Sequence, residues 1–351
     1  MKRINKQIKG EELFAGIDLH KLRWHVTIRT ADVDIFSSSI VGRWEELRKV
    51  LSRYKDCRIH AVYEAGYFGY SLYDHLTQYG VECIVTPPSL IPQEHGNRVK
   101  TDRLDSRKLA RLLAKGLLKS IWVPSSEERF HRQVIRRRRQ LVGDRVRTQN
   151  RIKSELCFYG IDLPTPRSKW SRVYFANLQR IKFRNHWMQQ SFNQLLEQYD
   201  FLSVQIDKQT KLLKQMAQLP LYQDRVKILC SIPGIGNLTA MEILLELQDV
   251  SRFRRADQLA AYVGLTPSQF SSADKIRMGR ITRAGKNTVR SALVESCWHL
   301  IRKDKAMRKK YEQIKARAGG KRAIVAVSRK LLLCIRRLLL DNRPYTYDPV
   351  H

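Results

Sequence analysis

The sequence predicts a mixed α/β domain at the N-terminal end, followed by a region that is mostly helical. Before about residue 90, short apolar runs alternate with polar residues, as in β-strands that are buried on one face. Beyond residue 125, apolar residues recur every three or four positions between long polar side chains, as in amphipathic helices. The 351 residues are enough for two domains and a connector, each domain with its own core.

The composition is strongly basic. The chain has 66 Lys and Arg against 33 Asp and Glu, a formal net charge of +33. This charge exceeds what solubility requires and favours a polyanionic partner, which makes nucleic acid the leading candidate. The basic residues are spread along the chain and do not collect on one amphipathic segment, which argues against a membrane partner. Six cysteines without a CxxC pair indicate reduced thiols, and residues 1–10 lack the apolar core of a signal peptide, so we expect a cytoplasmic protein.

Eight elements are predicted in the first domain, residues 1–124. The expected strands cover residues 13–18, 24–29, 35–40, 59–64 and 81–85, and the expected helices cover residues 44–51, 72–79 and 101–117. Tight links between the first three strands predict an antiparallel meander. The order of strand, strand, strand, helix, strand, helix, strand, helix is that of the ribonuclease H fold.

Four acids fall at special places in this order. Asp18 ends the first apolar run, and Glu64 ends the fourth strand. Asp102 and Asp105 lie three residues apart in the first turn of a helix that Thr101 is expected to cap. Each acid alone is compatible with a solvent-facing strand end or with the favourable field at a helix N-terminus. Together they predict a site for two Mg²⁺ ions about 3.5–4 Å apart, acting on a nucleic-acid phosphate, with Mn²⁺ as an open alternative.

Residues 125–218 predict a basic helical connector. Gly160, Pro164 and Pro166 divide it into two arms, which favours an antiparallel helical hairpin. The apolar stripe of the second arm suits the first arm or a second subunit, so we expect a dimer or a tetramer. A solvated connector that contacts nothing is the alternative.

Residues 219–351 predict a second, mostly helical domain. The turn Pro233-Gly234-Ile235-Gly236 between two apolar segments is typical of a helix-hairpin-helix motif, although many such turns only pack two helices. A serine pair, Ser271 and Ser272, is expected in a short loop after Pro267. Taken alone, the two serines are compatible with ordinary turn residues, because no histidine stands nearby to activate them.

Basic residues and glycines of the last two regions are predicted to contact the phosphate backbone of nucleic acid. They are Arg136, Arg137, Arg138, Arg139, Gly234, Gly236, Arg277, Arg280 and Arg283.

Five segments carry a resemblance that covers nearly the whole chain and is weakest between about residues 154 and 216. They are Gly16-Ile17-Asp18, Tyr63-Glu64-Ala65, Lys100-Thr101-Asp102 with Asp105, Ser231-Ile232-Pro233-Gly234-Ile235-Gly236, and Gly264-Leu265-Thr266-Pro267. In the same order, they resemble the insertion-sequence transposases with an Asp-Glu-Asp-Asp motif, the one-ten family. Because the matching segments fall in two separate domains, the resemblance is specific.

The resemblance implies an architecture and a partner. In that family a RuvC-like nuclease domain is joined by a coiled coil to a transposase domain that bears a serine nucleophile. A structured bridge RNA selects the donor and target DNA of a prokaryotic host. The family's acidic motif falls on the four acids named above.

The resemblance also implies a reaction. The family's serine lies five residues after the proline of Gly-Leu-x-Pro, which is Ser272 here. Ala273 stands where the family usually has glycine, so Ser271 stays an alternative. The implied steps are strand cleavage through a phosphoserine with a free 3′ hydroxyl, followed by strand exchange through a junction. One subunit supplies the acids and another supplies the serine.

Two other functions stay open. The first is a metal-dependent nuclease of DNA junctions that uses activated water and needs only the first domain. The second is a non-catalytic nucleic-acid-binding protein in which the acids are structural.

Overall fold

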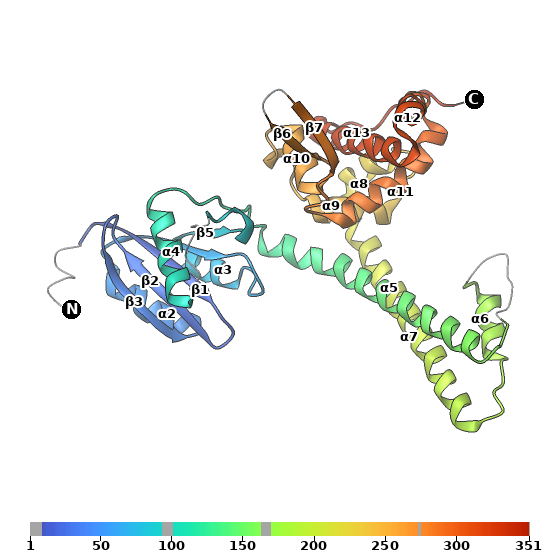
Figure 1. Ribbon diagram of the computed structural model, residues 1–351, viewed down its shortest axis with the longest axis horizontal. Helices are drawn as coiled ribbons and strands as arrows, with labels where there is room; N and C mark the ends of the chain where they lie inside the picture. Colours follow the sequence, from blue (N-terminus) through green and yellow to red (C-terminus); the bar gives the residue numbers. More distant parts are fainter. Residues whose placement is uncertain (1–8, 93–100, 163–169, 273–274, 351) are drawn as a thin grey trace. The chain divides into compact units, whose positions relative to one another are not determined.

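In the computed structural model the chain forms two compact units, residues 1–124 and residues 125–351 (Figure 1). The structure describes residues 9–92, 101–162, 170–272 and 275–350, without the side chains of residues 270–278. Within these ranges, no helix has the length and apolar character needed to cross a membrane.

Unit 1, residues 1–124, has the predicted mixed α/β order. Its strands are β1 (Glu12–Leu19), β2 (Arg23–Arg29), β3 (Asp34–Val41), β4 (Arg58–Glu64) and β5 (Glu82–Thr86). Its helices are α2 (Trp44–Leu51), α3 (Ser71–Gln78) and α4 (Asp102–Ala114), with the 3₁₀ turns η1 (Ser52–Tyr54) and η2 (Pro88–Leu90). The strands form one sheet in the order β3-β2-β1-β4-β5. The pairings β1–β2 and β2–β3 are antiparallel, which confirms the predicted meander, whereas β1–β4 and β4–β5 are parallel.

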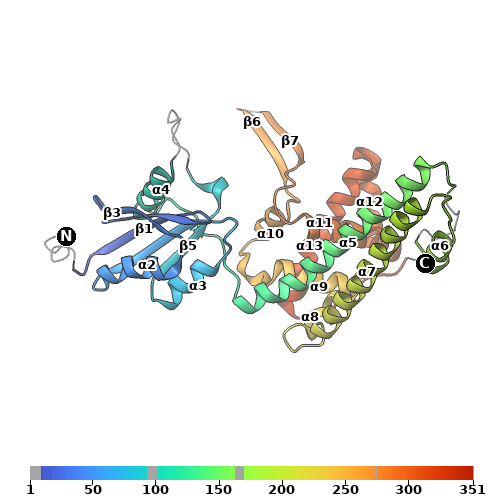
Figure 2. The same ribbon diagram turned by 90° about the horizontal axis from the view of Figure 1, so that it is seen from below.

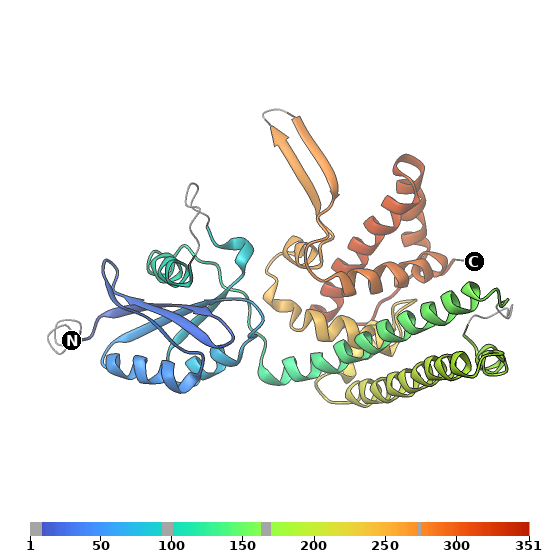
Figure 3. The same ribbon diagram turned by 60° about the horizontal axis from the view of Figure 1, so that its bottom comes forward.

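The two faces of this sheet are covered by different helices. Successive residues of a strand point to opposite faces, so the buried residues Leu13, Ala15 and Ile17 of β1 share one face and join the main apolar cluster of the unit. Helices α2 and α3 cover that face, and α4 lies on the other (Figures 2 and 3). The second face is more polar, because the fully buried Thr27 of β2 and Ser106 of α4 share a hydrogen bond of 2.8 Å across it.

Gly16 lets α4 lie close against β1. A Cβ atom at this position would stand 2.1 Å from the carbonyl oxygen of Ser106 and 2.5 Å from the backbone nitrogen of Ala110. Because both neighbours are backbone atoms of a helix, no side-chain rotation relieves the collision, and α4 has to shift.

Gly16→Ala is therefore expected to lower the free energy of unfolding of unit 1 by about 3 kcal/mol and to displace the first turn of α4. Urea titration of the full chain measures the change. Gly66→Ala is the matched control, because the nearest atom to its added Cβ would be the Glu64 carbonyl oxygen at 3.9 Å. Equal stability of the two variants would contradict this role for Gly16.

Unit 2, residues 125–351, is mostly helical, as predicted. A pair of long helices, α5 (Ser126–Phe158) and α7 (His186–Met216), packs side by side (Figure 1). The other elements are α6 (Arg172–Gln179), α8 (Gln223–Cys230), α9 (Asn237–Leu247), η3 (Val250–Arg252), α10 (Ala256–Val263), β6 (Pro267–Ser272), β7 (Lys275–Ile281), α11 (Asn287–Lys303), α12 (Lys305–Ala318) and α13 (Gly320–Asp341). The long pair is antiparallel, because Leu141 of α5 clusters with Leu202 and Ile206, whereas Ile152 clusters with Phe192 nearer the start of α7.

The expected short loop that carries the serine pair is a strand instead. Ser271 and Ser272 end β6, which pairs with β7 in an antiparallel hairpin, so the loop assignment was wrong. The serine-rich composition favoured a turn. The backbone groups of an extended segment must still find hydrogen-bond partners, and β7 supplies them.

A buried carboxylate connects three parts of unit 2. Glu246 of α9 is 2% exposed, and its Oε1 lies 3.3 Å from Nε of Arg136 in α5. Its Oε2 lies 3.2 Å from Nζ of Lys286, the residue before α11. Burial by itself raises the pKa of Glu246, but the ion pairs with Lys286 and Arg136 outweigh burial and leave the pKa below its ordinary value of 4.5.

Glu246→Gln is expected to lower the free energy of unfolding by about 1–3 kcal/mol at neutral pH, because two partly buried cations lose their counter-charge. A carboxylate with a lowered folded-state pKa stabilises the fold above pH 4.5 and loses that contribution as the pH falls through the lowered value. The difference between wild type and variant should therefore shrink in acid. Urea titrations at several pH values measure it, with the exposed Glu295→Gln in α11 as the control. A difference that grows in acid would contradict the ion-pair assignment.

Candidate metal site at the edge of the N-terminal sheet

Asp18 and Glu64 lie on neighbouring strands at one edge of the sheet. β1 and β4 are parallel, so their carboxyl ends share an edge. The last paired residues are Ile17 and Tyr63, which places the following residues, Asp18 and Glu64, side by side on adjacent strands. Asp18 is half-buried and Glu64 is exposed.

Helix α4 brings the other two acids to this edge. Its N-cap is Thr101, as predicted, whose Oγ1 accepts a hydrogen bond of 3.3 Å from the backbone N–H of Leu104. Asp102 and Asp105 both lie in the first turn. The helix is held on the sheet by the Ser106–Thr27 hydrogen bond and by an ion pair of 2.7 Å between Arg107 Nε and Asp34 Oδ2.

His20 joins two of the acids. Its Nε2 lies 3.2 Å from Oδ2 of Asp18 and 3.3 Å from Oδ1 of Asp102. One ligand atom from each of the three residues lies within 4.8 Å of the others, a spacing at which they could hold a metal ion. The structure thus brings together an acid from β1, an acid from α4 and an imidazole from the β1–β2 turn.

Burial and neighbouring acids raise the pKa of Asp18. Burial raises the pKa of this carboxyl above its ordinary value, and His20 opposes that effect. The neighbouring charges of Asp102 and Asp105 raise the pKa further, so both acids of α4 are close enough to act on Asp18. Like charges gathered in this way are relieved by a cation, and carboxylate oxygens are the ligands that Mg²⁺ and Mn²⁺ prefer. The residues present therefore fit a divalent metal ion.

His20 was not among the residues predicted from the sequence. The available signal was its position two residues after Asp18, just past the end of the same strand. An exposed histidine in a turn is more often solvated than functional, and only the position of α4 shows that this imidazole meets a second carboxylate.

The residues predicted in unit 2 have varied surroundings. The side chains of Ser271, Ser272 and Arg277 lie outside the described part of the chain, whereas Arg280 and Arg283 are exposed. Gly234 has φ +92°, and a Cβ there would stand 2.5 Å from the Ser296 carbonyl oxygen, so it is needed for packing against α11. A Cβ at Gly236, the N-cap of α9, would have nothing within 4 Å, which leaves this backbone accessible.

The arginine run 136–139 faces inward more than its charge suggested. Arg136 pairs with Glu246, Arg138 Nε donates a hydrogen bond of 2.8 Å to Thr210 Oγ1 in α7, and Arg139 pairs with Glu242. Arg137 is exposed. Three of the four arginines therefore have a structural role within unit 2, and Arg137 is the member best placed to contact a polyanion.

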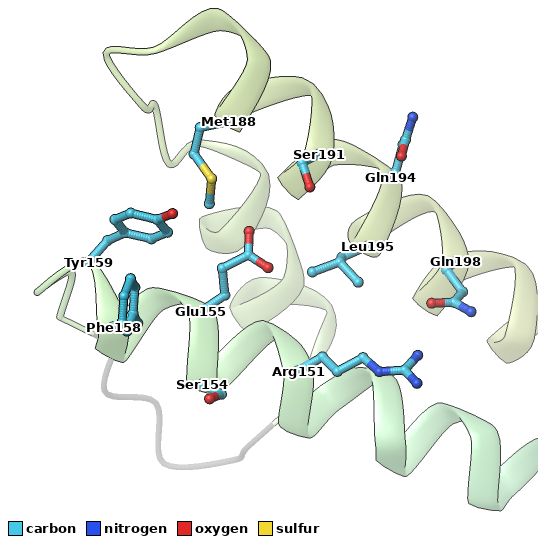
Figure 4. A pocket seen from close by; sticks show the side chains of 10 residues that line it. All are labelled: Arg151, Ser154, Glu155, Phe158, Tyr159, Met188, Ser191, Gln194, Leu195 and Gln198. Carbon is cyan, nitrogen blue, oxygen red and sulfur yellow. The ribbon is translucent and has the colours of Figure 1, made fainter.

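A separate groove of about 890 Å³ lies between α5 and α7. Figure 4 shows the side chain of Glu155 directed into it, near Met188 and Leu195. Burial raises the pKa of Glu155. Glu155 is the single acid among the lining residues, so the groove lacks the clustered carboxylates of the edge in unit 1.

Comparison with known proteins adds two family matches. Residues 15–161 match a family described as "Transposase" and named for the Asp-Glu-Asp-Asp motif of IS110. Residues 226–312 match the family described as "Transposase IS116/IS110/IS902 family". Between them, the matches cover most of the chain, including the acids of unit 1.

Three relatives are similar over most of their own length. The y4qE protein of Sinorhizobium fredii (strain NBRC 101917 / NGR234) is 29% identical over 297 residues, which are 82% of this chain and 71% of y4qE. The transposase for insertion sequence element IS1533 of Leptospira borgpetersenii is 28% identical over 243 residues, 68% of this chain and 70% of that protein. The pilin gene-inverting protein of Moraxella bovis is 28% identical over 262 residues, 71% of this chain and 69% of that protein.

The two family matches fall in the same order along the chain and define a DNA-processing enzyme, a class that agrees with the basic composition and the acidic sheet edge. The chain belongs to the IS110 family of transposases.

Proposed function

We propose that this transposase is an RNA-guided DNA recombinase that joins donor and target strands with a serine nucleophile and a metal-assisted acidic site. The observation that supports it most is the meeting of Asp18 and Asp102 at His20, because these acids come from residues far apart in the sequence. Asp105 and Glu64 complete the proposed acid set. The proposal also takes unit 1 as a RuvC-like, ribonuclease H-type domain.

In the proposed reaction, Oγ of Ser272 attacks a DNA phosphorus, and the bond from phosphorus to the 3′ oxygen breaks. One fragment of the cut strand is then linked to the protein through a 5′ phosphoserine, and the other ends in a 3′ hydroxyl, which takes up the proton that the serine loses. The 3′ hydroxyl of a partner strand then attacks the phosphoserine and releases the serine, so phosphodiester bonds are conserved. Divalent metal, Mg²⁺ or Mn²⁺, would supply charge neutralisation at the phosphate and activation of the attacking oxygen.

The protein's own residues have positioning roles in this scheme. Asp18, Glu64, Asp102 and Asp105 would hold the metal, and His20 would keep the carboxylates of Asp18 and Asp102 in place. Arg277, Arg280 and Arg283 would offset phosphate charge near the serine. Ser271 is the alternative nucleophile.

The assembly is part of the same proposal. Residues 125–218 form a coiled-coil connector used for dimer or tetramer formation, and residues 219–351 form the transposase domain. Arg137 and the accessible backbone at Gly236 are proposed contacts to the nucleic-acid backbone. A guide RNA would select donor and target DNA through base pairing, and the serine of one subunit would act with the acids of another.

The name of one relative favours recombination over simple cutting. The Moraxella bovis protein is named as a pilin gene-inverting protein, and inverting a gene requires rejoined strands. A nuclease that uses water would leave ends unjoined.

The test uses the full chain purified from cells together with any nucleic acid that it retains. Sequencing should recover one structured RNA, and incubation with the DNA ends of its own insertion sequence and Mg²⁺ should give a protein–DNA adduct that survives denaturing electrophoresis. Cutting without an adduct would support the water-activated nuclease. Mg²⁺-independent binding without cutting would support the non-catalytic protein. If no specific RNA were recovered, the proposed guidance by RNA would be contradicted.

A further inference from the structure

Exposed apolar side chains occur on the connections at the edge of the sheet that carries the acids. Tyr67 is 93% exposed, Leu22 is 78% exposed and Leu90 is 50% exposed. Leu22 lies in the turn after β1, Tyr67 in the loop after β4, and Leu90 at the end of η2 after β5. Because β1, β4 and β5 are parallel, these three connections leave the same edge as Asp18 and Glu64.

The loop that carries Tyr67 is fixed to the core. The backbone N–H of Ala65 donates a hydrogen bond of 2.8 Å to the Thr86 carbonyl, and Gly69 N–H donates one of 3.2 Å to the Gly66 carbonyl. The hydroxyl of Tyr63, a fully buried residue, donates a hydrogen bond of 2.9 Å to the Gly69 carbonyl. Tyr67 is thus presented to solvent by a turn that is held at both ends.

A second aromatic ring stands beside Tyr67. The rings of Tyr67 and Phe68 have centroids 5.7 Å apart in an edge-to-face arrangement, and Tyr67 follows Glu64 by three residues. Single exposed apolar residues are common and mean little. Three of them, however, lie on three separate connections at the sheet edge that carries Asp18 and Glu64.

We propose that Tyr67 stacks on an unpaired nucleobase of the strand whose phosphate reaches the acids, with Leu22 and Leu90 against the same stretch of bases. The proposal rests on the proposed function, in which this edge receives DNA. Bases present flat apolar faces once they leave the double helix, and aromatic side chains bind them with little sequence preference. The chain's net charge of +33 favours a nucleic-acid partner, and the metal proposed at Asp18 and Asp102 would draw a phosphate of that partner to this edge.

Photo-crosslinking of the full chain tests the placement. A single-stranded oligonucleotide that carries 5-iodouracil is bound to the protein in EDTA and irradiated, and the adducts are mapped by mass spectrometry. We expect an adduct on the peptide with residues 65–70, lost in Tyr67→Ala and kept in Tyr67→Trp. The control is Tyr79→Ala, whose ring is 41% exposed at the end of α3, packs edge-to-face on Trp44 and should leave the adduct unchanged. Adducts confined to other peptides, or none at all, would overturn the proposal.

Affinity measured on the same samples gives a second readout. Tyr67→Ala should weaken binding of the oligonucleotide by about 5-fold or more, whereas Tyr67→Trp should bind as tightly as wild type. With an abasic strand of the same length, wild type and Tyr67→Ala should bind equally. A loss of the same size with the abasic strand would mean that Tyr67 contacts the backbone or supports the fold, and would contradict stacking.

These results are separable from the fate of the proposed function. Binding in EDTA requires neither metal nor cleavage. A crosslink at Tyr67 in a chain that never forms a serine adduct would therefore support stacking and contradict the proposed recombinase function. Normal strand transfer without a crosslink or an affinity loss would contradict the stacking of Tyr67 and leave the proposed recombinase function intact.

Discussion

Asp102→Asn is expected to slow metal-dependent strand cleavage strongly while DNA binding and the fold persist. Removing one carboxylate from the group leaves the proposed metal with a weaker hold, and metal assistance supplies several kcal/mol at the transition state, so the rate should fall about 10²–10⁴-fold. Asparagine keeps the size of the side chain and its place in the first turn of α4. The rate of cutting on the element's own DNA ends, at saturating Mg²⁺, measures the effect.

The control for this variant is Asp56→Asn. Asp56 is exposed and precedes β4, so it lies at the opposite edge of the sheet from Glu64. The Asp56→Asn variant should cut DNA at the wild-type rate. A second readout is thermal stability: Mg²⁺ should raise the melting temperature of wild type and Asp56→Asn and have little effect on Asp102→Asn. If Asp102→Asn kept both the wild-type cutting rate and the Mg²⁺-induced rise in melting temperature, Asp102 would not be part of the metal site.

Ser272→Ala is expected to eliminate the covalent protein–DNA adduct and to reduce strand transfer by at least about 10³-fold, because no other group would replace a missing nucleophile. DNA binding and the Mg²⁺-induced rise in melting temperature should stay at the wild-type level, since the proposed metal ligands are all in unit 1. Denaturing electrophoresis of radiolabelled strands measures the adduct.

The neighbouring residue supplies the matched control. Ser271→Ala removes the same atom one position earlier in β6 and should leave the adduct in place. If Ser271→Ala abolished the adduct and Ser272→Ala did not, the nucleophile would be Ser271. An adduct in the double variant would show that neither serine forms it.

Much of unit 1 could be predicted from the sequence, because its information is local. The alternation of apolar and polar residues located each strand of the sheet, and Thr101 marked the start of α4 through its capping geometry. The expected positions of Asp18 and Glu64 near the ends of their strands followed from these boundaries, and the parallel pairing of β1 with β4 places the two residues on neighbouring strands.

What could not be predicted depends on contacts between distant segments. The link from His20 to Asp102 requires α4 to lie within 2.1 Å of where a Cβ of Gly16 would be, and no local pattern reports that approach. The arginine run suggested a polyanion contact by its charge alone, whereas the counter-charges of Arg136 and Arg139 come from α9, more than 100 residues later. The serine pair has a composition typical of a turn, and it lies in a strand because β6 pairs with β7.

The most direct measurement is anomalous diffraction from crystals of the full chain soaked in Mn²⁺. A manganese peak is expected about 2 Å from carboxylate oxygens of both Asp18 and Asp102. A chain that cleaves DNA in Mn²⁺, yet has its manganese elsewhere and none between these two acids, would contradict it.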